Sequence, residues 1–436
     1  MLSGRLRRST SAGKHVSSFH LTGKFALPFS VHAPSFGGSR QPTLRFRNSM
    51  RLNHNIHLGY CTNIHRGETW EETFASLNTH TLAVRNQVCP DQAYGIGLRL
   101  GYEAAKELAR PGQLSAFQKW LTNHDCYVFT INGFPYGQFH GTRVKEQVYL
   151  PDWTSDERVV YTNSLFDILA EIAPHTSGGS VSTVPGSFKE FITSRDQVDR
   201  MRVNVSRCAE HIDALCQSSG KDLHLGMEPE PLCWFETTDE TIEFFEPLDS
   251  ATKQRVGVNY DTCHLAVEFE DAATSLQKLS DAGIRISKLH LSSALSLEPT
   301  PDALERLAAF TEDVYFHQVV ERHPAAGVPD KLVRYRDLPD ALAKAKAEPG
   351  AVGDEWRVHF HVPVHAQPEL LFGDTRGQII GVLDVLKKLP TLCRHMEIET
   401  YTWEVLPREL RSANVVDQLV NEYDWCLSEL RARDLA

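Results

Sequence analysis

The stretch Leu225-Gly226-Met227-Glu228-Pro229-Glu230 is a short apolar run that ends in two carboxylates. The stretch Val258-Asn259-Tyr260-Asp261-Thr262-Cys263-His264 repeats this arrangement, with Asp261 and His264 at its end. Helical spacing follows each of them, at residues 238–245 and 272–282. Short β-rich runs that alternate with helical segments predict a parallel sheet with crossover helices.

The same alternation extends from residue 56 to the end of the chain and gives seven or eight strand–helix units. That number favours a closed (β/α)₈ TIM barrel over an open sheet. No Gly-x-Gly-x-x-Gly or P-loop sequence follows the first strand, which argues against a dinucleotide-binding fold. The strands are expected at residues 56–64, 127–131, 180–184, 223–228, 256–260, 286–291, 358–364 and 396–401.

Two stretches are longer than a plain barrel unit requires. Residues 95–126 add a strand–helix portion before the second strong strand, and residues 296–355 separate two core strands. We therefore expect one barrel domain over residues 51–436, with an insertion at about 296–355. Insertions after barrel strands lie over the carboxyl-end face, where this one would form a lid or a substrate wall; the alternative is packing on the outside.

The first fifty residues differ in composition from the rest of the chain. They contain eight Lys and Arg residues and no acid, and the first acidic residue is Glu68. This Ser- and Arg-rich, acid-free composition predicts a disordered extension, with a mitochondrial or plastid transit peptide as one interpretation. The alternative is a plain tail, or an upstream start codon with Met50 as the true start.

Bulk composition limits location and partners. Nine scattered cysteines without a Cys-x-x-Cys pair indicate reduced thiols of an intracellular protein, cytoplasmic if no organelle signal operates. No run of 18 apolar residues predicts a membrane span. Removing the eight positive charges of residues 1–50 from the net charge of −11 leaves −19, which argues against nucleic acid as a partner.

Ionisable side chains gather at the ends of five predicted strands. Burial of carboxylates and imidazoles costs free energy unless they are paired or bound to a metal. Mixed carboxylate and imidazole ligands suit one divalent ion of Mn, Zn, Fe or Co. The candidates are Glu228 and Glu230, Asp261 and His264, His290, His359 and His361, and Glu397 and Glu399.

Each candidate has an alternative interpretation. Glu228, Asp261 and Glu399 end different apolar strands, which favours metal binding. His290 and His359 could be hydrogen-bonded barrel histidines, and Glu230 and Glu397 could bind backbone or arginine. His264 could be a ligand, a general acid or base, or a helix cap.

These residues resemble the sugar phosphate isomerase/epimerase group of the xylose-isomerase-like barrels. The resemblance implies that Glu228, Asp261, His290 and Glu399 hold one divalent metal, and that Glu228 and Glu399 form the acid/base pair. We expect His264 to assist by orienting or stabilising the enediolate oxygen. The candidate additional site comprises His359, His361, Glu230 and Glu397.

Five phrases resemble the EboE family of metabolite traffic proteins within this superfamily. The likeness covers about residues 55–430 and implies processing or traffic of a secondary-metabolite precursor. The phrases are YCTNIH at 60–65, GMEPEP at 226–231, DTCH at 261–264, VHFHVP at 358–363 and EIETYTWEVL at 397–406.

Two classes of function compete at this point. The first is a metal-dependent isomerase or epimerase that acts on a small sugar-like or hydroxy-carbonyl metabolite. The second is a non-catalytic metabolite carrier or scaffold that keeps the barrel. A minor alternative, an endonuclease IV-like enzyme, is suggested by the paired His359 and His361 but lacks a basic groove for DNA.

Overall fold

The computed structural model describes residues 49–137, 145–312, 314–325, 329–366, 371–404 and 412–436. The basic extension expected over residues 1–50 therefore lies outside the described residues, apart from its last two. Met50 is buried, and its carbonyl oxygen accepts hydrogen bonds from Leu58 N at 3.0 Å and from the Tyr127 hydroxyl at 3.2 Å. No helix in the described ranges is long and apolar enough to cross a membrane.

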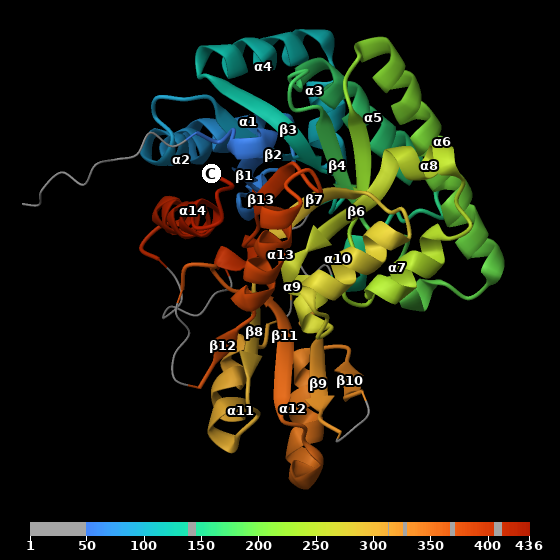
Figure 1. Ribbon diagram of the computed structural model, residues 1–436, viewed down its shortest axis with the longest axis vertical. Coiled ribbons are helices and arrows are strands. Elements are labelled where there is room, and N and C mark those ends of the chain that lie inside the picture. Colours follow the sequence, from blue (N-terminus) through green and yellow to red (C-terminus); the bar gives the residue numbers. More distant parts are fainter. Residues whose placement is uncertain (1–48, 138–144, 313, 326–328, 367–370, 405–411) are drawn as a thin grey trace, which may run out of the picture. The chain divides into compact units, whose positions relative to one another are not determined.

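Eight parallel strands form a closed barrel, as predicted (Figure 1). Their order is β1-β13-β7-β6-β5-β4-β3-β2, and a parallel bridge between Cys61 and Gly97 joins the two ends of the sheet. The strands are β1 (His57–Tyr60), β2 (Tyr94–Arg99), β3 (Cys126–Asn132), β4 (Gly179–Thr183), β5 (Leu223–Met227), β6 (Val256–Asp261), β7 (Ile286–Leu291) and β13 (His395–Ile398).

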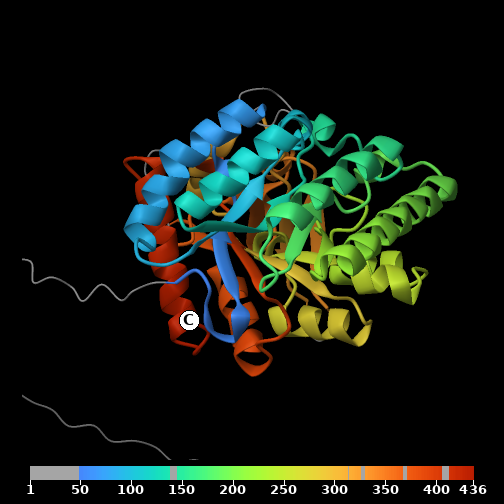
Figure 2. The same ribbon diagram turned by 90° about the horizontal axis from the view of Figure 1, so that it is seen from above.

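Helices surround the barrel and bury their apolar faces against it (Figure 2). They are α1 (Trp70–Ser76), α2 (Leu82–Val88), α3 (Tyr102–Leu108), α4 (Pro111–Asn123), α5 (Asp156–Ile172), α6 (Arg195–Ser219), α7 (Thr238–Phe245), α8 (Ser250–Arg255), α9 (Thr262–Val267), α10 (Ala272–Asp281), α13 (Arg376–Lys388) and α14 (Val415–Arg431). Helix α6 shows how the sequence determines such an element. It buries Met201, Val205 and Ile212 on one face and ends at Gly220, whose φ of +66° suits a residue without a side chain.

A second, antiparallel sheet is inserted between β7 and β13. Its order is β10-β9-β11-β8-β12, from β8 (Ala294–Leu297), β9 (Val319–His323), β10 (Lys331–Tyr335), β11 (Glu355–His361) and β12 (Gly373–Asp374). With α11 (Pro301–Leu307) and α12 (Leu338–Ala347) it encloses a separate core that includes Leu295, Trp356 and Phe360. The chain enters this sheet directly after β7, at the carboxyl-end side of the barrel (Figure 1).

Two sequence-based strand assignments were wrong. Residues 358–364 were expected as a barrel strand, but β11 pairs only with β8 and β9 of the second sheet. The vacant barrel position belongs to β2, which opens the stretch 95–126 that was interpreted as a strand–helix addition to the barrel. Gly95 and Gly97 weaken the apolar signal of β2. A Cβ on Gly97 would lie 1.7 Å from Glu397 Oε1, so the barrel interior requires glycine there.

Candidate metal centre and active site

Four of the predicted residues meet at the carboxyl ends of four different strands. Glu228 follows β5, Asp261 ends β6, His290 lies on β7, and Glu399 follows β13. All four are buried, and one ligand atom of each lies within 4.8 Å of those of the others. His290 Nδ1 is 2.9 Å from Glu228 Oε1, 2.8 Å from Glu399 Oε2 and 3.5 Å from Asp261 Oδ2.

Asp261 shows that the donor set fits a metal. Its Oδ1 accepts three hydrogen bonds, from Cys263 N at 2.6 Å, His264 N at 3.0 Å and Ser292 Oγ at 2.6 Å. Its Oδ2 is buried and accepts no hydrogen bond in the described part of the chain. A carboxylate held by one oxygen while the other faces three acidic or imidazole groups suits a cation ligand. Three carboxylates and one imidazole would satisfy a divalent ion such as Mn²⁺, Fe²⁺, Co²⁺ or Zn²⁺.

The charges of the group support the same conclusion. Burial opposes ionisation of Glu228 and Asp261, but neighbouring histidines nevertheless lower both pKa values. Burial likewise opposes a charge on His290, yet Glu399 and Glu228 raise its pKa well above the usual value. A proton on His290 thus balances the carboxylates where no dication does. A bound dication would replace that proton and supply more positive charge.

A buried ion pair lies one residue layer deeper in the barrel. Lys288 Nζ is 2.5 Å from Glu397 Oε2, and neither side chain is exposed to solvent. The same ammonium donates to Asn132 Oδ1 at 2.7 Å and Ser182 Oγ at 3.0 Å. Burial opposes the charge of Glu397, but Lys288 lowers the pKa of this carboxyl to about 2. Glu397, a candidate additional ligand, therefore lies beneath the four-residue group.

Glu397 nevertheless acts on the group through His290. Glu397 Oε2 lies 3.2 Å from His290 Nε2, on the opposite side of the ring from the carboxylates. An Nε2–H that donates to Glu397 leaves the lone pair of Nδ1 facing Glu228, Asp261 and Glu399. A carboxylate behind a ligating imidazole fixes its tautomer and raises its basicity.

His264 borders the group from α9. Its Nδ1 donates to the Pro229 carbonyl oxygen at 2.9 Å and lies 3.5 Å from Glu230 Oε2. Its Nε2 is 4.0 Å from Asp261 Oδ2. Burial lowers the pKa of His264, but Asp261 and the nearby glutamates outweigh this and raise it to about 9. Glu230 is buried beside it, and burial raises the pKa of that carboxyl to about 8.

The paired histidines of β11 reach the same site from the second sheet. The ring centroid of His264 lies 4.7 Å from that of His359 and 5.5 Å from that of His361. Both histidines are buried. Their rings thus lie beside His264, although they belong to a different sheet from the other residues.

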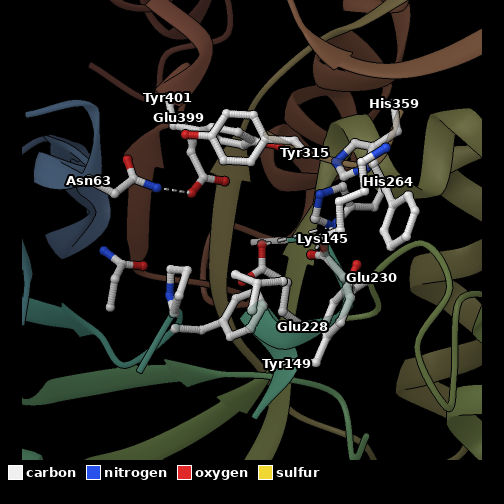
Figure 3. Close-up of a pocket in the computed structure, with 15 residues that line it drawn as sticks. Asn63, Lys145, Tyr149, Glu228, Glu230, His264, Tyr315, His359, Glu399 and Tyr401 are labelled. Carbon is white, nitrogen blue, oxygen red and sulfur yellow. Dashed lines mark hydrogen bonds and ion pairs between the residues drawn. The ribbon is translucent and has the colours of Figure 1, made fainter. Parts of the chain in front are cut away.

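A pocket opens above the four-residue group (Figure 3). Glu228, Glu230 and Glu399 form its acidic side together with His264 and His359. Its other walls are mainly aromatic and polar, and part of them comes from Tyr315 and Phe316, ahead of β9. These wall residues are Asn63, Asn132, Phe134, Pro135, Lys145, Val148, Tyr149, Tyr315, Phe316 and Tyr401.

Some residues in and around the site were not predicted as site residues. Asn63 Nδ2 donates to Glu399 Oε1 at 2.7 Å and so orients that carboxylate, and its only signal in the sequence was the phrase YCTNIH at 60–65. Lys288 could have been found, because it stands two residues before His290 in an apolar strand and so faces the same side. Lys145 binds Asp337 Oδ2 at 2.6 Å across 192 residues, which no local pattern reveals.

No protein-family model matches the sequence, and no curated protein matches it. Solved structures that resemble the chain include a D-tagatose 3-epimerase-like protein, with 12% identity, a TM-score of 0.47, and coverage of 86% of this chain and 98% of that one. A xylose isomerase domain protein from Planctomyces limnophilus is 13% identical with a TM-score of 0.44, and the match covers 80% of this chain and 91% of that one. D-allulose 3-epimerase from Methylomonas sp., in complex with D-allulose, is 10% identical with a TM-score of 0.44, and the match covers 86% of this chain and 96% of that one.

Proposed function

We propose that this protein is a metal-dependent enzyme of the isomerase or epimerase type that acts on a small sugar-like or hydroxy-carbonyl metabolite. The observation that carries the proposal is the placement of Glu228 and Glu399. Both belong to the four-residue group that fits a dication, and both line the pocket above it. A passive carrier has no need for two carboxylates that share a cation and also face a ligand, so the open pocket favours an enzyme.

The side chains around the pocket would have separate roles in the reaction. Glu228, Asp261, His290 and Glu399 would hold the metal, which when bound polarises a carbonyl and its adjacent hydroxyl as a Lewis acid. Glu228 or Glu399 takes the proton from the carbon next to the carbonyl, and the other returns a proton. Asn63 keeps Glu399 Oε1 in place, so that this carboxylate approaches the substrate in a fixed orientation.

Two further elements define the chemistry around the reacting carbon. His264, with its raised pKa, would orient or stabilise the enediolate oxygen. Phe134, Tyr149 and Phe316 present apolar faces to a substrate and limit water in the pocket. We further propose, from the motif resemblance to the EboE family, that the metabolite is a secondary-metabolite precursor.

Proton exchange at carbon tests the proposed function. Purified protein with Mn²⁺, incubated in D₂O with a panel of ketoses and α-hydroxy ketones, is expected to exchange the α-hydrogen of at least one of them by ¹H NMR. Glu228→Gln and Glu399→Gln should each lower that rate by at least 100-fold, whereas exposed Glu210→Gln should not alter it. Equal rates in all four proteins would show that the two carboxylates are not the acid/base pair.

A further inference from the structure

A second cavity, the amino-end cavity, lies at the opposite end of the barrel from the four-residue group. It has a volume of about 370 Å³, and its lining includes residues 175–178, Asp222, Arg285 and residues 391–394. These stretches directly precede β4, β5, β7 and β13, so the cavity lies at the amino ends of the strands. Pockets that bind small molecules have volumes of about 300–1,000 Å³. The amino-end cavity is therefore large enough for a metabolite.

A layer of imidazoles occupies this end of the barrel. His57 begins β1, His395 begins β13, and His224 is the second residue of β5. All three are buried, and the ring centroid of His395 lies 5.2 Å from that of His224 and 6.1 Å from that of His57. His224 and His395 line the amino-end cavity. Branched aliphatic side chains usually fill a barrel interior, so packing alone does not account for this layer.

The two imidazoles that line the cavity differ in their hydrogen bonds. His395 Nε2 donates to the Ser177 carbonyl oxygen at 3.0 Å, and its Nδ1 lies 2.8 Å from Ser180 Oγ, so both ring nitrogens are used. His224 is only 3% exposed, and its Nδ1 is buried without a hydrogen-bond partner in the described part of the chain. An unmade hydrogen bond of a buried group costs stability. The His224 ring thus has hydrogen-bonding capacity that a ligand in the cavity could use.

Positive charge predominates around the amino-end cavity. Arg285, Arg394 and His175 line it, and Asp222 is the single acid among the described residues that do so. Arg285 donates to both oxygens of Asp222, at 3.1 and 2.5 Å, and Arg255 Nη1 lies 3.7 Å from the same carboxylate. Two arginines therefore balance this one acid. The fork from Arg285 to Asp222 uses only some of the guanidinium N–H groups, so others can bind a ligand.

The buried imidazoles experience the same positive charge. Burial lowers the pKa of both His224 and His395, and Arg285 lowers both further. Both rings therefore stay neutral, and the ring of His224 keeps one N–H to donate. Arginines together with a neutral N–H donor favour an anion. The pocket above the four-residue group has the opposite character, because carboxylates form one side of it.

We propose that the amino-end cavity binds a small metabolite through an oxyanion, either a phosphate or a carboxylate group. Arg285 and Arg394 would contact the charged oxygens, and His224 would donate its N–H to one of them. The planar guanidinium matches both kinds of oxyanion in geometry. The volume of the cavity leaves room for the uncharged part of the same molecule.

This ligand would be a different molecule from the substrate of the proposed function. Glu228 stands four residues after His224, which corresponds to about 13 Å along a strand. The buried pair of Lys288 and Glu397 lies in the layer between the two ends of the barrel. The proposal therefore concerns a separate site and does not depend on a metal.

Anion titration of the chelator-stripped full chain tests this proposal. Inorganic phosphate and malonate are the probes, because they distinguish a phosphate site from a carboxylate site. Isothermal titration calorimetry at fixed ionic strength should give one equivalent of at least one probe. His224→Phe and Arg394→Gln each remove a donor to the anion and should weaken that binding at least tenfold. Arg200→Gln, which alters an exposed arginine of α6, should bind like wild type.

Hydrogen–deuterium exchange of the wild-type protein locates the site even if a variant fails to fold. The bound probe should slow exchange at residues 175–178 and 391–394. Binding of phosphate alone would identify a phosphate ligand, and binding of malonate alone a carboxylate ligand; both agree with the proposal. Absence of saturable binding of either probe would overturn it, as would equal affinity in all four proteins or slower exchange only around residues 399–404. None of these results depends on metal binding, so the proposed function is tested independently.

Discussion

Substitution of Lys288 by methionine gives the sharpest prediction for stability. The Lys288 ammonium is fully buried and makes three contacts, to Glu397, Asn132 and Ser182, at 2.5, 2.7 and 3.0 Å. Methionine fills a similar volume but removes the charge, which leaves the Glu397 carboxylate buried without its main partner. Loss of one member of a buried ion pair costs about 3–5 kcal/mol.

That cost translates into a measurable change of melting temperature. The unit that contains the barrel has roughly 390 residues, which corresponds to an unfolding entropy of about 0.8 kcal/mol/K. Lys288→Met should therefore lower Tm by about 4–6 °C. The double substitution Lys288→Met with Glu397→Gln removes both charges, and it should recover more than half of that loss because no uncompensated charge remains.

Differential scanning calorimetry of the metal-free and Mn²⁺-loaded full chain would measure these effects. A matched control is Lys278→Met, whose half-exposed ammonium is 2.7 Å from Asp239, because an exposed pair contributes about 1 kcal/mol or less. If Lys288→Met has the same Tm as wild type, the buried pair does not stabilise the barrel. The same conclusion follows if the Tm of the double variant falls by as much as the two single variants together.

Three other substitutions probe different parts of the structure. Gly97→Ala places a methyl group on Glu397 Oε1 and should lower Tm by several degrees by calorimetry; an unchanged Tm would contradict the close packing. Glu399→Gln should lower Mn²⁺ affinity by roughly tenfold or more; an identical Mn²⁺ response would exclude Glu399 as a ligand. Burial raises the pKa of Glu422 from 4.5 to about 7. The neutral carboxyl therefore stabilises the fold fully below pH 4.5. This contribution, up to about 3 kcal/mol, is lost as the pH rises through 7. Glu422→Gln should therefore gain in Tm relative to wild type between pH 5 and pH 8, and parallel pH profiles would refute this assignment.

The four-residue group was predictable because its information is local. Glu228, Asp261 and Glu399 each end an apolar run, and parallel strands in a closed barrel bring such ends together. The division of roles among the remaining candidates was not predictable. Glu397 and Glu399 share one face of the chain, yet one binds Lys288 below the site and the other lines the pocket. Only the depth of each residue in the barrel distinguishes them.

The strand assignment failed where the decisive contact is distant in sequence. Gly97 must be glycine because Glu397, 300 residues later, occupies the space in front of it. Because glycine stands at that position, the apolar pattern of β2 is too weak to identify it as a barrel strand. Conversely, β11 has the apolar alternation of a core strand because it is buried within the second sheet. Periodicity shows that a strand is buried but does not show which sheet contains it.

The insertion between β7 and β13 has a consequence for the order of folding. The strand β13 pairs with β7 on one side and with β1 on the other, so its register joins residues near 60, 290 and 397. The inserted sheet has its own apolar core and antiparallel neighbours, and its loops are shorter than those that close the barrel. Because closure of short loops costs less entropy, this sheet can assemble before β13 arrives. The arrival of β13 then closes the barrel and delivers Glu399 in a single event, so that a nascent chain completes the four-residue group only at the end of folding.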